Sequence, residues 1–229
     1  MGKEVKMKEK ILGIIFSLSL IVAIFFTSFE IAAYSDWGFY EKEYRKFEVA
    51  KDLGMEYPDI MDVTKYMMDY LRGREERLTY ETKIEGELKD FFNGQDRFHM
   101  AEVRDLFLGG YAMRNVCAII CVVTLGLIIY LDKNWKSILG KMYQRTLIIF
   151  MGGVAILGTL IAVNFNKCFL MFHKIFFDND LWIFDPATDY MIRMLPEGFF
   201  FDMVVRIGVI FIILLVATYA LFRKTYKKF

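Results

Sequence analysis

Two residues stand out for chemistry, His99 and His173, because the chain holds no other histidine. An imidazole exchanges protons near neutral pH, so it is well suited to act as a general acid or base. Each histidine lies beside a long apolar segment. If these segments cross a membrane, as argued below, both histidines lie at one membrane face, where acid–base catalysis on a lipid ester is the leading hypothesis.

His99 begins a helical pattern in which Glu102, Val103 and Leu106 follow at i+3, i+4 and i+7, so the four side chains share one face. A carboxylate at i+3 can hold one imidazole nitrogen as N–H and leave the other as a base. Glu102 is therefore a supporting candidate. The Gly109-Gly110 pair follows, where we expect the helix to bend or break.

His173 precedes a run that alternates aromatic residues with aspartates, unlike an ordinary solvent loop. We take Asp180, Trp182 and Asp185 from this run as supporting or substrate-binding candidates. A short amphipathic helix over residues 190–195 follows and is expected to lie in the membrane interface.

Other reaction classes find less support. The sequence has no Gly-rich phosphate loop, no His-Glu-x-x-His and no Gly-x-Ser-x-Gly motif. Cys168 lies near His173, which leaves a Cys–His dyad as a weaker alternative. Two histidines and an aspartate would suit zinc, but their spacing matches no metal motif, and a position at the interface argues against haem. These alternatives therefore rank below acid–base catalysis.

Composition indicates an integral membrane protein, because 56% of the 229 residues are hydrophobic while the net charge is only +1. That charge gives no reason to expect a nucleic-acid partner. Four apolar segments can each cross about 30 Å of hydrocarbon. The expected division is 1–33 (N-terminus and first span), 34–110 (extracellular cap), 111–131 (second span), 132–145 (cytoplasmic loop), 146–165 (third span), 166–202 (extracellular loop with the interfacial helix) and 203–229 (fourth span and C-terminus).

Orientation follows from the positive-inside rule. Lysine and arginine gather in three segments that four spans place on one side: Lys3, Lys6, Lys8 and Lys10; Lys133, Lys136, Lys141 and Arg145; Arg223, Lys224, Lys227 and Lys228. We therefore expect a multi-pass cell-membrane protein with both termini cytoplasmic. The first apolar segment is too long for a signal peptide and is interpreted as a retained anchor.

The first outer segment is expected to be largely helical, with one helix ending at Gly54 and a second running from Pro58 to Gly73. Residues 78–92 show a weaker pattern, and 79–85 is left open between a short hairpin and an irregular cap. The expected fold is an all-α membrane protein, a four-transmembrane-helix bundle with a mainly helical extracellular cap.

Three charges fall within or near the apolar spans. Arg206 is a functional candidate by default, with Glu30 as a conceivable partner near the outer face. Arg114, at interfacial depth, either binds a lipid phosphate or snorkels to water.

Several motifs over most of the chain resemble the lipoprotein intramolecular transacylases, or Lit family, of low-GC Gram-positive bacteria. They are Tyr40-Glu41-x-x-Tyr44, Tyr70-Leu71-x-Gly73, His99-Met100-x-Glu102-Val103-Arg104, His173-x-x-Phe176-Phe177-x-Asn179-Asp180-x-Trp182-x-Phe184-Asp185-Pro186 and Leu195-Pro196-Glu197-x-Phe199-Phe200. The chain departs from the family at Glu102, where aspartate is common; glutamate keeps the charge and changes the reach.

The resemblance implies an acyltransferase that acts on a diacylglyceryl lipoprotein in the outer leaflet. The α-amine of the lipoprotein's N-terminal cysteine attacks the sn-2 ester, and a lyso-form lipoprotein results. The family's two catalytic histidines correspond to His99 and His173, and no metal or cofactor is implied. We expect a monomer among membrane lipids.

Two alternatives stay open. One is a non-catalytic four-span protein whose extracellular cap binds a lipid or protein partner. The other is a metal-dependent lipid hydrolase.

Overall fold

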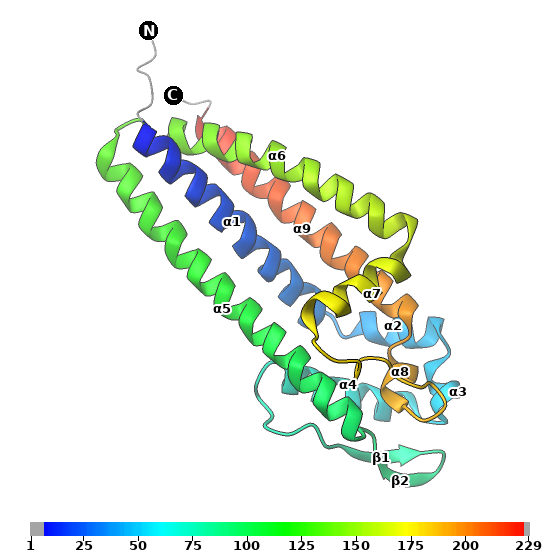
Figure 1. Cartoon of the computed structure of the whole chain (residues 1–229). Helices are drawn as coiled ribbons and strands as arrows, with labels where there is room; N and C mark the ends of the chain where they lie inside the picture. Colours follow the sequence, from blue (N-terminus) through cyan, green and yellow to red (C-terminus); the bar gives the residue numbers. More distant parts are fainter. Residues whose placement is uncertain (1–6, 227–229) are drawn as a thin grey trace. The chain divides into compact units, whose positions relative to one another are not determined.

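The computed structural model describes residues 7–226, so Lys3, Lys6, Lys227 and Lys228 of the orientation argument lie outside the described residues. The chain order of the elements in Figure 1 is α1 (Met7–Tyr34), α2 (Gly38–Lys46), α3 (Val49–Leu53), α4 (Tyr57–Leu71), β1 (Glu81–Ile84), β2 (Glu87–Asp90), α5 (Gly94–Leu131), α6 (Trp135–Val163), α7 (Phe165–Phe176), α8 (Tyr190–Met194) and α9 (Glu197–Tyr226).

Four of these helices, α1, α5, α6 and α9, are long and apolar enough to cross a membrane, which confirms the predicted fold class. Helix α5 has 38 residues and is therefore about 57 Å long, nearly twice the hydrocarbon thickness. Its apolar part, 111–131, is long enough for the span by itself. The preceding part, 94–110, carries His99 and most of the helix's charges outside that span.

Two predicted boundaries were wrong. Helix α5 does not break at Gly109-Gly110 but includes both residues, and its ribbon in Figure 1 is continuous. A helical glycine costs only about 1 kcal/mol, which a long helix tolerates. The expected loop 132–145 shrinks to residues 132–134, because Asp132 accepts the N–H of Asn134 at 2.7 Å in a tight turn and α6 begins at Trp135.

The chain divides into two compact units, which are described separately. The first comprises residues 7–32, 111–164 and 205–226, and holds the apolar parts of the four long helices. Glu30 forms an ion pair with Arg114 here, so the structure gives Arg114 a protein partner. Buried side chains form two clusters: Phe16, Ile128, Ile138, Leu139 and Met142 in one, and Ile21, Ile24, Tyr143, Phe211 and Leu215 in the other.

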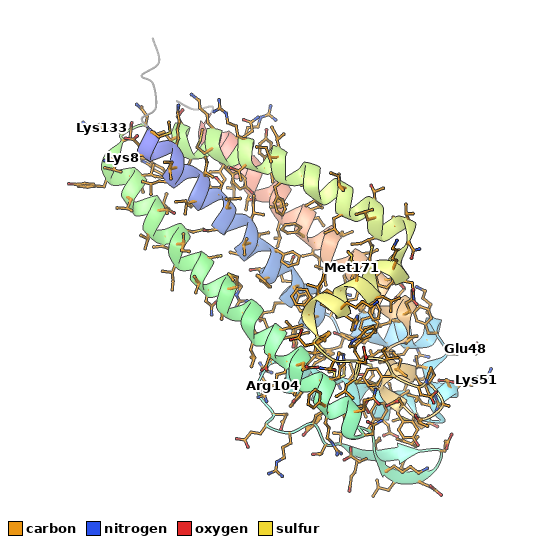
Figure 2. The ribbon with its side chains drawn as sticks, viewed as in Figure 1. Lys8, Glu48, Lys51, Arg104, Lys133 and Met171 are labelled. Atoms are coloured by element: carbon orange, nitrogen blue, oxygen red, sulfur yellow. The ribbon has the colours of Figure 1, made fainter. Side chains whose placement is uncertain are left out.

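The second unit comprises residues 33–110 and 165–204, so two segments far apart in sequence share one core. Tyr44 is fully buried; its hydroxyl lies 2.7 Å from Thr64 Oγ1 in α4, and its ring stacks on Phe199 at the start of α9. The guanidinium of Arg104, labelled in Figure 2, lies 4.8 Å over the ring of Tyr70. The last contact packs residues 94–110 of α5 against α4 of the same unit.

Two segments of this unit can be compared with what the sequence led us to expect, the hairpin region and the first helix. Residues 81–90 form an antiparallel hairpin of β1 and β2, which resolves the alternative left open. The single helix expected to end at Gly54 is split into α2 and α3, because Glu48 adopts a left-handed conformation (φ 53°) between them.

The end of α4 allows a first prediction. Gly73 has φ 78°, its N–H bonds the carbonyl of Tyr70 at 3.0 Å, and Arg74 N–H bonds that of Asp69 at 2.9 Å, a Schellman motif. Gly73→Ala should lower the free energy of unfolding by about 1 kcal/mol, because alanine is strained at positive φ. Thermal unfolding in detergent measures this.

Gly208→Ala in α9 is the control for that change. A Cβ at Gly208 meets nothing within 4 Å, and alanine favours a helix. This variant should unfold at or slightly above the wild-type temperature. Equal melting temperatures for the two variants would contradict the prediction.

Candidate active site

The two histidines, 74 positions apart in sequence, meet within the second unit. Their ring centroids are 5.9 Å apart with an interplanar angle of 27°. His99 comes from residues 94–110 of α5 and His173 from α7, and their exposed fractions are only 6% and 7%. The structure therefore brings together the pair that the sequence marked for chemistry.

Aromatic rings enclose both imidazoles. Phe177 and Phe184 lie against His99 at centroid distances of 4.8 and 5.4 Å. Phe169 and Trp182 lie against His173 at 4.3 and 4.8 Å. This apolar wall keeps water from the rings, so the imidazoles meet a low dielectric that penalises a positive charge.

Both histidines are consequently neutral at pH 7. Burial, with a smaller contribution from the neighbouring imidazole of His173, lowers the pKa of His99 to about 4. Burial also lowers the pKa of His173, against an opposing effect of its hydrogen bond to Phe169. A neutral imidazole is the form that can accept a proton.

The tautomer of His173 follows from its hydrogen bond. Its Nδ1 lies 2.8 Å from the carbonyl oxygen of Phe169, one turn back in α7. A carbonyl only accepts, so Nδ1 carries the hydrogen and Nε2 keeps a free lone pair. In His99, by contrast, Nδ1 is buried without a hydrogen-bond partner among the described residues. The pair thus offers one oriented base and one imidazole free to bond an incoming group.

The expected hydrogen bond from the imidazole of His99 to the carboxylate of Glu102 does not form, so that expectation was wrong. The carboxylate turns instead to a loop residue: Glu102 Oε1 accepts from Asn179 Nδ2 at 2.8 Å. Asn179 in turn orients Trp182 of the aromatic wall, because the main-chain carbonyl of Asn179 accepts from Trp182 Nε1 at 2.8 Å. Glu102 therefore reaches His173 indirectly, through Asn179 and the indole.

A second contact that the sequence analysis missed holds the same loop. Gln95 Nε2 donates to the carbonyls of Leu181 and Ile183, both at 3.0 Å. Gln95, His99 and Glu102 stand at i, i+4 and i+7 on α5, so they share one helix face. Gln95 and Glu102 therefore bond the loop on either side of His99 along the helix. The i, i+4 spacing of Gln95 and His99 was the only feature of the sequence that pointed to Gln95, and a single glutamine at such a spacing is common.

Two other predicted site residues, Asp180 and Asp185, are exposed, and Asp185 Oδ1 accepts the N–H of Ala187 at 2.9 Å in a turn. Arg114 and Arg206 belong to the first compact unit, where Arg206 is half-buried.

The structure also bears on two alternatives, a Cys168–His173 dyad and a metal site. Cys168 stands five positions before His173 on α7, about 140° around the helix, so the two side chains leave from different faces. Within residues 7–226, no three histidine, cysteine, aspartate or glutamate side chains gather in a group able to hold a metal ion.

Comparisons with known proteins give one family. The family profile described as "Lipoprotein intramolecular transacylase Lit" matches residues 14–200. The structure of the membrane-integral Lit from Bacillus cereus is 23% identical and has a TM-score of 0.77, covering 96% of this chain and 97% of that one. Two variants of that protein, with one histidine replaced by alanine or arginine, give TM-scores of 0.74 and 0.73 at 23% and 22% identity, each covering 96% of this chain, and 94% and 93% of their own. A search of curated proteins gave no match. At these identities the structures show a shared fold.

Proposed function

The chain belongs to the lipoprotein intramolecular transacylase family, and it is an acyltransferase of the membrane. We propose that it moves the sn-2 acyl chain of a diacylglyceryl lipoprotein to the α-amine of the N-terminal cysteine, leaving a lyso-form lipoprotein. His99 and His173 do the acid–base work in this proposal. The observation that carries it is the buried, neutral imidazole pair inside an aromatic wall.

The chemistry needs one proton to move between two atoms of the same substrate. Nε2 of His173 takes a proton from the amine as nitrogen attacks the ester carbonyl, and a C–N bond forms. The C–O bond to the glyceryl oxygen then breaks, and that oxygen receives a proton. It is the proton that His173 took from the amine, passed on directly or through the facing imidazole of His99, whose Nδ1 is unbonded, so both histidines end the cycle neutral.

These groups suffice without further activation. An α-amine has a pKa of about 7.7–8.0, so a useful fraction is already free base near neutral pH. Nucleophile and ester belong to one molecule, and correct orientation of such groups contributes several kcal/mol to the rate. The aromatic wall excludes water, which would otherwise compete with the amine and release a fatty acid.

The substrate's position defines the rest of the proposal. Lys8, Lys10 and the basic residues around 133–145 put both termini in the cytoplasm, so the imidazole pair faces the outer leaflet. Residues 34–110 and 166–202 are then extracellular, and the enzyme works as a monomer among lipids. The loop that meets the lipid head contains Asp180, Trp182 and Asp185. Arg114 and Arg206 lie toward the bilayer.

Mass spectrometry of a lipoprotein N-terminus tests this function. The purified chain in lipid vesicles is mixed with a synthetic diacylglyceryl lipopeptide bearing a free α-amine. We expect the mass to stay constant while one acyl group moves from oxygen to nitrogen, which fragmentation locates. Loss of a whole acyl chain would indicate a lipid hydrolase instead, and an unchanged lipopeptide would favour a non-catalytic binding protein.

A further inference from the structure

A pair of buried carboxyl groups lies one helical turn from His99. Asp96, in the first turn of α5, has no exposed surface, and Asp189, which precedes α8, is 3% exposed. Asn93 hydrogen-bonds to both side chains, so the two carboxyl groups lie close together. They connect the start of α5 to the end of the loop whose beginning packs on the imidazoles.

The surrounding hydrogen bonds come from uncharged groups. Asn93 caps α5, since its Oδ1 accepts the N–H of Asp96 at 3.0 Å, while Asp96 Oδ2 accepts the N–H of Asn93 at 2.9 Å. The Nδ2 of Asn93 donates to Asp189 Oδ1. Arg97 acts on Asp96 through space only, because its guanidinium bonds Asp90 at 2.5 Å and the carbonyl of Leu78 at 3.0 Å.

The second carboxyl oxygen of Asp96 indicates where a proton lies. Asp96 Oδ1 is buried and has no hydrogen-bond partner among the described residues. Two adjacent carboxylates in a buried site repel each other, so one of them keeps a proton. With the proton on Asp96, the repulsion becomes a hydrogen bond and the orphaned oxygen acquires a partner.

We propose that Asp96 is protonated in the active enzyme and donates to Asp189, and that this bond positions His99 against the aromatic loop. Asp96 is thus a positioning residue rather than a catalytic one. Its effect on rate rests on the proposed function, whereas its protonation does not.

The pH dependence has a definite sign. Burial, followed by the nearby Asp189, raises the pKa of Asp96 to about 7, while the Asn93 N–H and Arg97 oppose the shift. The folded state then holds a proton that the unfolded chain releases near pH 4. Stability therefore falls as pH rises between about 4 and 7, and it is level above that range.

Asp96→Asn tests the proposal, because an amide reproduces the protonated carboxyl: its oxygen accepts from Asn93 and its nitrogen donates to Asp189. The melting temperature of this variant should lack the wild-type decline between pH 5 and 7. Its rate should match wild type at pH 6 and exceed it by about tenfold at pH 8, where few wild-type molecules keep the proton. Asp96→Ala should be slow at every pH.

The matched control is Asp178→Asn, which removes the same charge from an exposed side chain of the same loop and should follow the wild-type profile. Identical pH profiles of melting temperature and rate in Asp96→Asn and wild type would overturn the proposal. So would failure of both Asp96→Asn and Asp189→Asn to fold, since each replaces the repulsion with a hydrogen bond. A wild type with no transacylase activity would refute the proposed function alone, because the melting profile still reports the proton.

Discussion

Replacing His173 by alanine is expected to lower the rate of acyl transfer by a factor on the order of 10²–10⁴, the usual contribution of a positioned general base. The bond from Nδ1 to the carbonyl of Phe169 presents Nε2 as the proton acceptor, and the rings of Phe177 and Trp182 in the aromatic wall offer no equivalent lone pair. Initial rates of N-acyl product formation, measured with the lipopeptide in vesicles, give the factor directly.

His99→Ala should lose activity to a similar extent. The double variant should be no slower than the slower single variant, because two groups that move one proton act as a unit. Lys174→Ala is the control, since Lys174 is the exposed neighbour of His173 on α7. A His173→Ala rate within threefold of wild type, in protein that melts normally, would remove His173 from the mechanism.

The parts of this site that the sequence predicts are those with a local signal. Long apolar runs flanked by lysine and arginine identify the spans whatever their packing. Two histidines in a chain of this length, each just outside a span, are conspicuous for the same reason. Their contact follows only if the outer segments fold together, which the topology makes plausible and which the structure shows.

Contacts between distant segments have no such signal. Glu102 bonds Asn179 across 77 positions, and Asn93 bonds Asp189 across 96. Helical spacing placed Glu102 beside His99, but a long side chain can also reach groups on other segments. The carboxylate of Glu102 bonds the side-chain amide of Asn179 in the loop instead. Asp96 looks from the sequence like an ordinary capping residue; its protonation depends on a partner that arrives nearly a hundred residues later.

The Glu102–Asn179 bond leads to the second large effect. Asn179→Asp would place a carboxylate against that of Glu102 and remove the donor, so the loop should lose its hold on α5. The main-chain carbonyl of residue 179 would shift with the loop and no longer orient the Trp182 indole, which lies 4.8 Å from His173. We expect the rate to fall by about 10- to 100-fold, in the range of coupling energies of 0.5–3 kcal/mol between bonded neighbours.

Glu102→Gln should cost much less, because the amide oxygen of glutamine still accepts from Asn179. The decisive variant combines Glu102→Gln with Asn179→Asp, since it restores one amide–carboxylate bond with its direction reversed. Recovery of most of the rate would show that Glu102 acts by holding the loop.

Tryptophan emission separates this positioning role from a direct one. The chain has three tryptophans, so replacing Trp37 and Trp135 with phenylalanine leaves Trp182 as the reporter beside His173. Emission should change in Asn179→Asp and return in the double variant, in step with the rate. If Glu102→Gln alone is as slow as Asn179→Asp while the emission stays that of wild type, then the charge of Glu102 acts on the substrate itself, and the loop is held by Gln95.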